Sequence, residues 1–202
     1  MKNRKRNRMK GYDYSRDNLY FVTICVQKMR CCFGEVVEID KEKTDREVLG
    51  TALEITSTAR GLSVRNDSII PDEFHNNPVS KIMNLNAFGL IVQDRLWWLE
   101  KQYPYVLITN YVVMPNHVHA IIEIDSLKTT EKALTIKSLS SLVGAFKTTS
   151  SKLIHETGFL DFSWKRSFYD HIIRTPDAYE KISNYIDLNP QNWSQDSFFS
   201  EI

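Results

Sequence analysis

The chain has 202 residues, enough for one compact domain with its own hydrophobic core and too few for a multidomain protein. Its composition, 42% hydrophobic and 25% charged, is that of a globular protein, and no apolar run reaches the roughly 18 residues of a membrane span. The N-terminal segment is basic and lacks the apolar stretch of about 7 to 15 residues that a secretory signal needs, so we expect a cytoplasmic protein.

The net charge of +1 hides an uneven distribution. Six of the 26 Lys and Arg residues lie in the first ten positions, so the rest of the chain has fewer basic than acidic residues. We expect residues 1–12 to be a flexible basic arm, which either keeps the protein soluble or contacts the phosphates of a nucleic acid. Residues 13–193 then form a single domain, and 194–202 a tail. The three cysteines lack metal-binding spacing and are interpreted as reduced thiols.

The sequence of the first half of the domain indicates two strands and an insertion. Residues 20–27 are rich in β-branched and aromatic side chains, and residues 33–39 form a second strand that we expect to pair with them as a hairpin. Residues 40–80 are polar and weakly periodic, which indicates an insertion after the hairpin. Within it, Thr44 and Glu47 fit a capping box that opens a helix near 45–60.

The second half has clearer patterns. Apolar residues at spacings of three and four, from Leu85 to Tyr103, predict an amphipathic helix that ends before Pro104. A similar stripe predicts a helix over 136–156. The other predicted elements are an antiparallel pair at 106–114 and 117–124, divided by Pro115-Asn116, a strand at 163–174, and a terminal helix with Thr175 as N-cap, Pro176 in the first turn and Pro190 after its end.

Apart from the insertion, the order of elements is β-α-β-β-α-β followed by a helix. This order predicts an α+β fold of the ferredoxin-like sandwich type, with two helices on one face of an antiparallel sheet and the other face open to a substrate. The first and third strands are central in this topology, so residues 117–124 would run through the middle of the sheet.

His117 and His119 are the first candidates for chemistry. Strand side chains alternate between faces, so both imidazoles project to the face opposite the apolar Val118 and Ala120. At a backbone separation of about 6.6 Å they are able to bind one divalent ion. A His-x-His pair alone is weak evidence for a metal site and is more often two ordinary, half-exposed histidines.

Tyr185 and Asn189, four residues apart, share one face of the predicted terminal helix. A phenol is a weak nucleophile at its usual pKa near 10, but a metal ion that polarises a phosphate makes its attack feasible and gives a phosphotyrosine. The amide oxygen of Asn189 would complete the ligand set. The alternative is a packed tyrosine and a helix-capping asparagine.

Three sequence blocks carry a resemblance that covers most of the chain. They are Tyr-Val-Val-Met-Pro-Asn-His-Val-His (111–119), Trp-Lys-Arg-Ser-Phe-Tyr-Asp-His-Ile-Ile-Arg (164–174) and Tyr-Ile-Asp-Leu-Asn-Pro (185–190). In this order they resemble the signature blocks of the single-tyrosine transposases of the His-hydrophobic-His (HUH) superfamily, and most closely the REP-associated tyrosine transposases. The insertion at 40–80 is longer than the connection usual in that family.

The resemblance implies a ferredoxin-like homodimer that cleaves and rejoins single-stranded DNA beside a hairpin, acting at the nucleoid. It implies that His117 and His119 bind Mg²⁺ or Mn²⁺, that Tyr185 is the nucleophile, and that Asn189 is the third ligand. Asn is shorter than the Gln of many relatives. Two imidazoles and an amide oxygen are a poor set for holding zinc tightly, which agrees with this metal preference.

Further residues are candidates for DNA contact. Lys147, Lys152, Arg166 and Arg174 are able to bind phosphates, and Trp164, with Phe168 beside it, is able to stack on unpaired bases. Tyr169 and His171 share a strand face and could be mistaken for a nucleophile and its base. Because the backbone of a strand is stiff, we expect a structural or DNA-facing role for them.

The predicted function is thus a metal-dependent DNA strand transferase that works through a 5′-phosphotyrosine. Two alternatives remain open. One is a catalytically silent ferredoxin-like protein that binds nucleic-acid hairpins, and the other is a hydrolase that uses a metal-bound water and leaves Tyr185 without a role.

Overall fold

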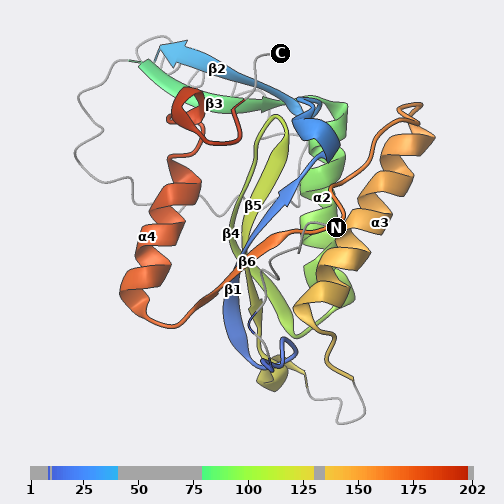
Figure 1. Ribbon diagram of the computed structural model, residues 1–202, viewed down its shortest axis with the longest axis vertical. Coiled ribbons are helices and arrows are strands. Elements are labelled where there is room, and N and C mark those ends of the chain that lie inside the picture. The colour runs from blue at the N-terminus through green and yellow to red at the C-terminus, as the bar shows by residue number, and fades with distance from the viewer. Residues whose placement is uncertain (1–8, 10, 41–78, 130–134, 200–202) are drawn as a thin grey trace, which may run out of the picture. The chain divides into compact units, whose positions relative to one another are not determined.

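The computed structural model describes residue 9 and residues 11–40, 79–129 and 135–199 (Figure 1). The helix predicted near 45–60, almost all of the 40–80 insertion and most of the basic arm lie outside these residues. The chain divides into two compact units, one made of Met1–Val36 with Met83–Ile202 and the other of Val37–Ile82. The larger unit has a mixed α+β fold that carries every residue discussed as a functional candidate.

A four-stranded antiparallel sheet forms the centre of the larger unit. Its strands are β1 (Asn18–Cys25), β4 (Val106–Val113), β5 (His117–Ile124) and β6 (Tyr169–Ile173), in the order β4-β5-β1-β6. The prediction that the first and third strands of the sheet are central is confirmed, since β1 and β5 are the inner pair. Their register sets His117 opposite Cys25 and His119 opposite Thr23.

Two predictions about strands were wrong. The expected hairpin between residues 20–27 and 33–39 does not form, because both edges of β1 are taken by β5 and β6. Instead β2 (Gly34–Asp40) pairs with β3 (Val79–Leu85) in a two-stranded sheet. The strand predicted over 163–174 is shorter than expected. Before β6, Trp164 makes a single bridge to Val26, and the ring of Trp164 turns into the core.

Two long helices cover one face of the four-stranded sheet (Figure 1). They are α2 (Ala87–Gln102) and α3 (Leu139–Glu156), and both were predicted. Asn86 caps the first by accepting from the backbone N–H groups of Phe88 and Gly89, and Ser138 caps the second. The main core lies between these helices and the sheet, and it includes Val22, Ile24, Val118, Ala120, Ile122, Leu96, Leu99, Leu142 and Phe146. None of the helices described is long and apolar enough to span a membrane.

A third helix, α4 (Pro176–Asp187), lies on the opposite face of the sheet (Figure 1). Its predicted start is confirmed, because the Thr175 side chain accepts from the Ala178 N–H and Pro176 follows it. Ile186 is fully buried and packs with Ile121 and Ile173 in a second, smaller core. The face that the sequence predicted to be open is therefore covered in part by α4.

Two side-chain contacts fasten the edge strand to this helix. Nδ2 of Asn110 on β4 donates to Oγ of Ser183 at 2.7 Å and to Oδ1 of Asp187 at 2.9 Å. Short 3-10 turns complete the described residues, at Gln27–Met29, Ser126–Lys128 and Trp193–Gln195. The three cysteines all lie within the described residues, and none of them is in a disulfide.

Candidate metal and nucleophile site

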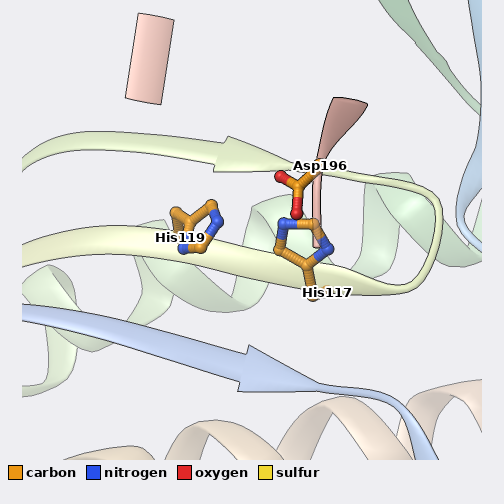
Figure 2. A group of neighbouring side chains, drawn as sticks. All are labelled: His117, His119 and Asp196. Carbon is orange, nitrogen blue, oxygen red and sulfur yellow. The ribbon is translucent and has the colours of Figure 1, made fainter. Parts of the chain in front are cut away.

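His117 and His119 project to the same face of β5, as their alternation predicted, but they are not exposed. Their exposed fractions are 0% and 1%. Figure 2 shows the two imidazoles side by side along the strand, with the carboxylate of Asp196 close to His117. The ring centroids of the two histidines are 4.5 Å apart. The expectation of half-exposed or surface-facing histidines was wrong, because α4 and the segment after it cover this part of the sheet.

Hydrogen bonds fix the orientation of the His117 ring. Its Nδ1 lies 2.9 Å from Oδ1 of Asn116, which is an acceptor, so Nδ1 carries the proton. The Asn116 amide cannot be turned around without loss, since its Nδ2 donates to the carbonyl oxygens of Met29 at 3.2 Å and Phe198 at 2.8 Å. Nε2 of His117 is therefore left with a lone pair, and this buried nitrogen has no hydrogen-bond partner among the described residues.

His119 is held at both ring nitrogens. Its Nδ1 lies 2.9 Å from the hydroxyl of Thr23, and its Nε2 lies 3.2 Å from the phenolic oxygen of Tyr185. Phe21 stacks against the ring at a centroid distance of 5.3 Å. Thr23, two residues further along β1, faces the same side of the sheet. The predicted nucleophile therefore meets one of the two predicted metal ligands within a single chain.

Tyr185 lies one residue before the buried Ile186 on α4 and remains 44% exposed. Burial of part of the ring raises the pKa of its phenol, the negative charge of Asp196 raises it further, and a hydrogen bond from Asn189 opposes both. The phenol borders a polar pocket of about 290 Å³ that is also lined by Asn189, Asn192, Gln195, Asp196 and Ser197. A phosphate group has room to approach the phenol there.

Asp196 is a site residue that the sequence analysis missed. It follows the turn Trp193–Gln195, and its Oδ1 accepts from the Phe198 N–H at 2.7 Å. One ligand atom of each of His117, His119 and Asp196 lies within 4.8 Å of the others, a grouping that fits a metal ion. Nothing in the sequence marks this aspartate, because an acidic residue in a polar tail usually lies in solvent.

Asn189 does not lie on the helix, in contrast to the prediction. The helix ends at Asp187 and Leu188 caps it, so Asn189 belongs to the turn that follows. Its Nδ2 donates to Oδ2 of Asp196 at 3.0 Å, while its buried Oδ1 has no hydrogen-bond partner within the part of the chain that the structure describes. Both atoms left unpartnered here, Oδ1 of Asn189 and Nε2 of His117, are of the kinds that bind divalent cations.

The charge state of the two histidines suits metal binding. Burial lowers the pKa of His117 to about 3. Burial and the neighbouring His117 lower the pKa of His119 to about 3, against the opposite effect of Asp196. Both rings are therefore neutral near pH 7, the form in which imidazole is a ligand.

The predicted DNA-binding residues lie in different places. Lys147, Lys152, Trp164 and Arg166 line a groove between α3 and the segment that follows it. Arg174 follows Ile173, which pairs with Leu19 at the opposite end of β1 from Cys25, so Arg174 lies far along the sheet from the histidines. Tyr169 and His171 are exposed on β6.

Two of the groove residues have structural contacts. Nζ of Lys147 donates to the carbonyl oxygens of Lys165 at 2.9 Å and Ser167 at 3.2 Å. Trp164 is 9% exposed, and its Nε1–H donates to Ser150. Lys152 and Arg166, in contrast, are exposed.

Comparison with known proteins gives sparse results. No family model matches the chain. An uncharacterized protein of Haemophilus influenzae is 26% identical over 209 residues, which cover 97% of this chain and 93% of that protein.

Two solved structures are similar to the chain at low identity. A REP-associated tyrosine transposase bound to a REP hairpin has 14% identity and a TM-score of 0.48, with 92% of this chain and 73% of that one covered. A protein described as a transposase from Deinococcus radiodurans has 13% identity and a TM-score of 0.38, with 89% and 95% covered. Likenesses this distant do not carry a function over, so function has to be argued from the site itself.

The buried histidines generate a prediction for stability. Their folded pKa of about 3 lies below the usual 6.5, so the unfolded chain binds protons more readily below about pH 6.5. Without metal, the free energy of unfolding should fall as the pH drops from 7 to 5, by on the order of 1–2 kcal/mol for each imidazole. Urea unfolding in EDTA at the two pH values measures this loss.

The matched control is the exposed His171. The variant His171→Gln should keep the full pH dependence, whereas His117→Gln should lose about half of it. An equal dependence in all three proteins would contradict the burial of a neutral His117.

Proposed function

We propose that this protein is a metal-dependent transposase that cleaves and rejoins single-stranded DNA near hairpins through a 5′-phosphotyrosine at Tyr185. The observation that carries the proposal is the 3.2 Å approach of the Tyr185 phenol to His119, beside a His-His-Asp cluster. The three sequence blocks that resemble single-tyrosine transposases contain both histidines and the tyrosine. The strand order, with the first and third strands at the centre, supports a ferredoxin-like sandwich as the scaffold.

We propose that His117, His119 and Asp196 hold the metal, with Asn189 as an additional oxygen ligand. The unpartnered Nε2 of His117 and Oδ1 of Asn189 support this assignment, since a buried polar atom without a partner is costly unless a ligand satisfies it. The carboxylate and amide oxygens of this set are ligands that Mg²⁺ and Mn²⁺ accept, and the two neutral imidazoles add nitrogen ligands for a divalent ion. When bound, the cation would polarise the substrate phosphate and offset its negative charge.

The proposed reaction uses Tyr185 as the nucleophile. Its phenolic oxygen forms a bond to phosphorus, the bond from phosphorus to the 3′ oxygen breaks, the phenolic proton is released, and the 3′ oxygen takes up a proton to leave as a hydroxyl. The link between tyrosine and phosphate keeps the bond energy, so a 3′-hydroxyl is able to reverse the step without a cofactor. All the proposed groups come from one chain. The site is therefore proposed to form within one chain, and the homodimer stays a prediction.

We propose that Lys152 and Arg166 bind DNA phosphates along the groove beside α3. Both are exposed, while Lys147 keeps the segment 165–167 in place through its backbone carbonyls. The backbone N–H of Lys165 donates to the carbonyl of Cys25, which is opposite His117 in the sheet. The groove thus begins at the same end of the sheet as the histidines.

Tyr185→Phe tests the nucleophile. The substitution removes one oxygen from a half-exposed ring, so folding and DNA binding should be unchanged, whereas the covalent adduct should be lost completely. Labelled single-stranded DNA with a hairpin is incubated with the protein and Mn²⁺ and analysed on a denaturing gel for a retarded, protease-sensitive band.

Tyr169→Phe is the matched control and should form the adduct at the parental rate. An adduct that survives in Tyr185→Phe and disappears in Tyr169→Phe would reverse the assignment. Cleaved DNA without any adduct would instead indicate a hydrolase that uses a metal-bound water. Hairpin binding without cleavage would indicate a catalytically silent binding protein.

The proposed metal ligands are tested by measuring Mn²⁺ affinity with electron paramagnetic resonance. His117→Ala, His119→Ala and Asp196→Asn should each weaken binding at least tenfold, because each removes a lone pair or the single negative charge of the set. Asn189→Ala should be milder, because water is able to replace one amide oxygen. The His→Ala variants should also lower thermal stability, since both rings are buried.

Asp187→Asn is the control for Asp196→Asn, because Asp187 is an exposed carboxylate at the end of α4 outside the cluster. Its Mn²⁺ affinity should equal that of the parent. Unchanged affinity in Asp196→Asn would exclude this aspartate as a ligand.

The groove is tested by the salt dependence of DNA binding. Lys152→Ala and Arg166→Ala should each weaken hairpin binding and reduce the slope of log K against log salt by about 0.7–0.9, the value for one lost phosphate contact. Fluorescence anisotropy at several salt concentrations gives the slope. Lys101→Ala, at an exposed lysine on α2, should leave affinity and slope unchanged.

A further inference from the structure

Asn116, in the turn between β4 and β5, is one of the least exposed polar residues of the site. Asn116 is 0% exposed, although it follows Pro115 in the turn between Val113 and His117. A turn asparagine ordinarily satisfies its own backbone or faces solvent. Within the described residues, the side chain of Asn116 instead contacts groups from three different segments.

These contacts use the two ends of the amide for different purposes. Nδ2 donates to the main-chain carbonyls of Met29 and Phe198, so the nitrogen end is identified by two acceptors. The opposite end must then be the oxygen, and it faces Nδ1 of His117 at 2.9 Å. An oxygen there accepts only from a protonated Nδ1, which leaves Nε2 of His117 without a proton.

We propose that Asn116 is the positioning residue of the metal site, which fixes His117 in the Nδ1–H tautomer and aims the lone pair of Nε2 at the ion. The inference rests on the metal site proposed above. It adds the residue that holds His117 in its metal-binding tautomer when no ion is bound. Hydrogen bonding of the second ring nitrogen is the general way in which proteins orient a histidine ligand, and loss of such a partner typically costs 10- to 100-fold in metal affinity.

The other histidine shows why Asn116 is needed. Nδ1 of His119 faces the hydroxyl of Thr23, and Nε2 faces the hydroxyl of Tyr185. Each hydroxyl is able to donate or to accept, so both tautomers of His119 are compatible with these partners. The Asn116 oxygen, in contrast, is only able to accept a hydrogen bond from Nδ1 of His117. Of the two histidines, His117 is therefore the one whose tautomer is fixed by its partner.

The experiment is nuclear magnetic resonance of the full-length, ¹⁵N-labelled protein in EDTA near neutral pH. Long-range proton–nitrogen spectra should show a protonated Nδ1 and an unprotonated Nε2 for His117, assigned with His117→Gln. A protonated Nε2 in the parent protein overturns the proposal, whatever the variants do.

Two substitutions separate the tautomer from simple support of the fold. Asn116→Ala removes the acceptor and both donors, so His117 should populate both tautomers and Mn²⁺ affinity should fall 10- to 100-fold. Asn116→Asp keeps an acceptor at Nδ1 but loses the donors to Met29 and Phe198. It should retain the tautomer and bind Mn²⁺ within about threefold of the parent or more tightly, because a carboxylate partner makes imidazole a stronger ligand.

Asn18→Ala is the matched control. It also removes an asparagine side chain with hydrogen bonds, to the Tyr12 hydroxyl and the N–H of Leu19, and it lies at the opposite end of β1 from Cys25, the residue paired with His117. It should lower stability without changing the His117 tautomer or Mn²⁺ affinity. If Asn116→Asp keeps the tautomer but loses Mn²⁺ binding, the amide acts by holding the loop and the tail, and the proposal is wrong.

The readouts use metal and no DNA. Failure of the Tyr185 adduct would therefore overturn the proposed transposase activity and leave this inference intact, whereas a wrong His117 tautomer would overturn this inference alone.

Discussion

The site depends on the burial of two neutral imidazoles between the central sheet and the segments that cover it. Burying a polar ring is costly unless its nitrogens find partners. Three of the four ring nitrogens do so, with Asn116, Thr23 and Tyr185, and Nε2 of His117 does not. The arrangement thus satisfies the rings almost completely and leaves one lone pair on the ring that lies beside Asp196.

The same burial determines the position of Tyr185, the proposed nucleophile. Ile186 anchors α4 in the small core with Ile121 and Ile173. A helix turns by about 100° per residue, so Tyr185 points away from that core toward the edge of the interface. Its phenol reaches His119 on one side and a solvent-accessible pocket on the other. A side chain at such a boundary is able to meet a phosphate from solvent while its oxygen stays beside the candidate ligands.

The sequence predicted those features that local patterns determine. The two core helices, the β4–β5 pair, the start of α4 and the shared face of His117 and His119 follow from periodicity, capping residues and strand alternation. The pairing of β2 was not predictable in this way. A hairpin between neighbouring strands is the local solution, and it was excluded by β5 and β6, which arrive at β1 from about 100 and 150 residues further along the chain.

Exposure of the site was the other feature beyond the reach of sequence patterns. Alternation assigns His117 and His119 to a face of the sheet, but it says nothing about whether a later segment covers that face. The covering elements, α4 and the segment around Asp196, act through contacts between residues more than 60 positions apart. Asp196 itself has no motif, and Asn116 has the ordinary signature of a turn.

Three of the four candidate ligands, His117, Asp196 and Asn189, are linked by a continuous set of hydrogen bonds. Asn116 joins His117 to the carbonyl of Phe198, the N–H of Phe198 donates to Asp196, and Asp196 accepts from Asn189. Each bond constrains the next, so the turn before β5, the end of α4 and the C-terminal segment hold their ligand atoms as one unit. A divalent ion entering this unit would find nitrogen and oxygen donors already oriented, and little ordering of the chain would be needed to bind it.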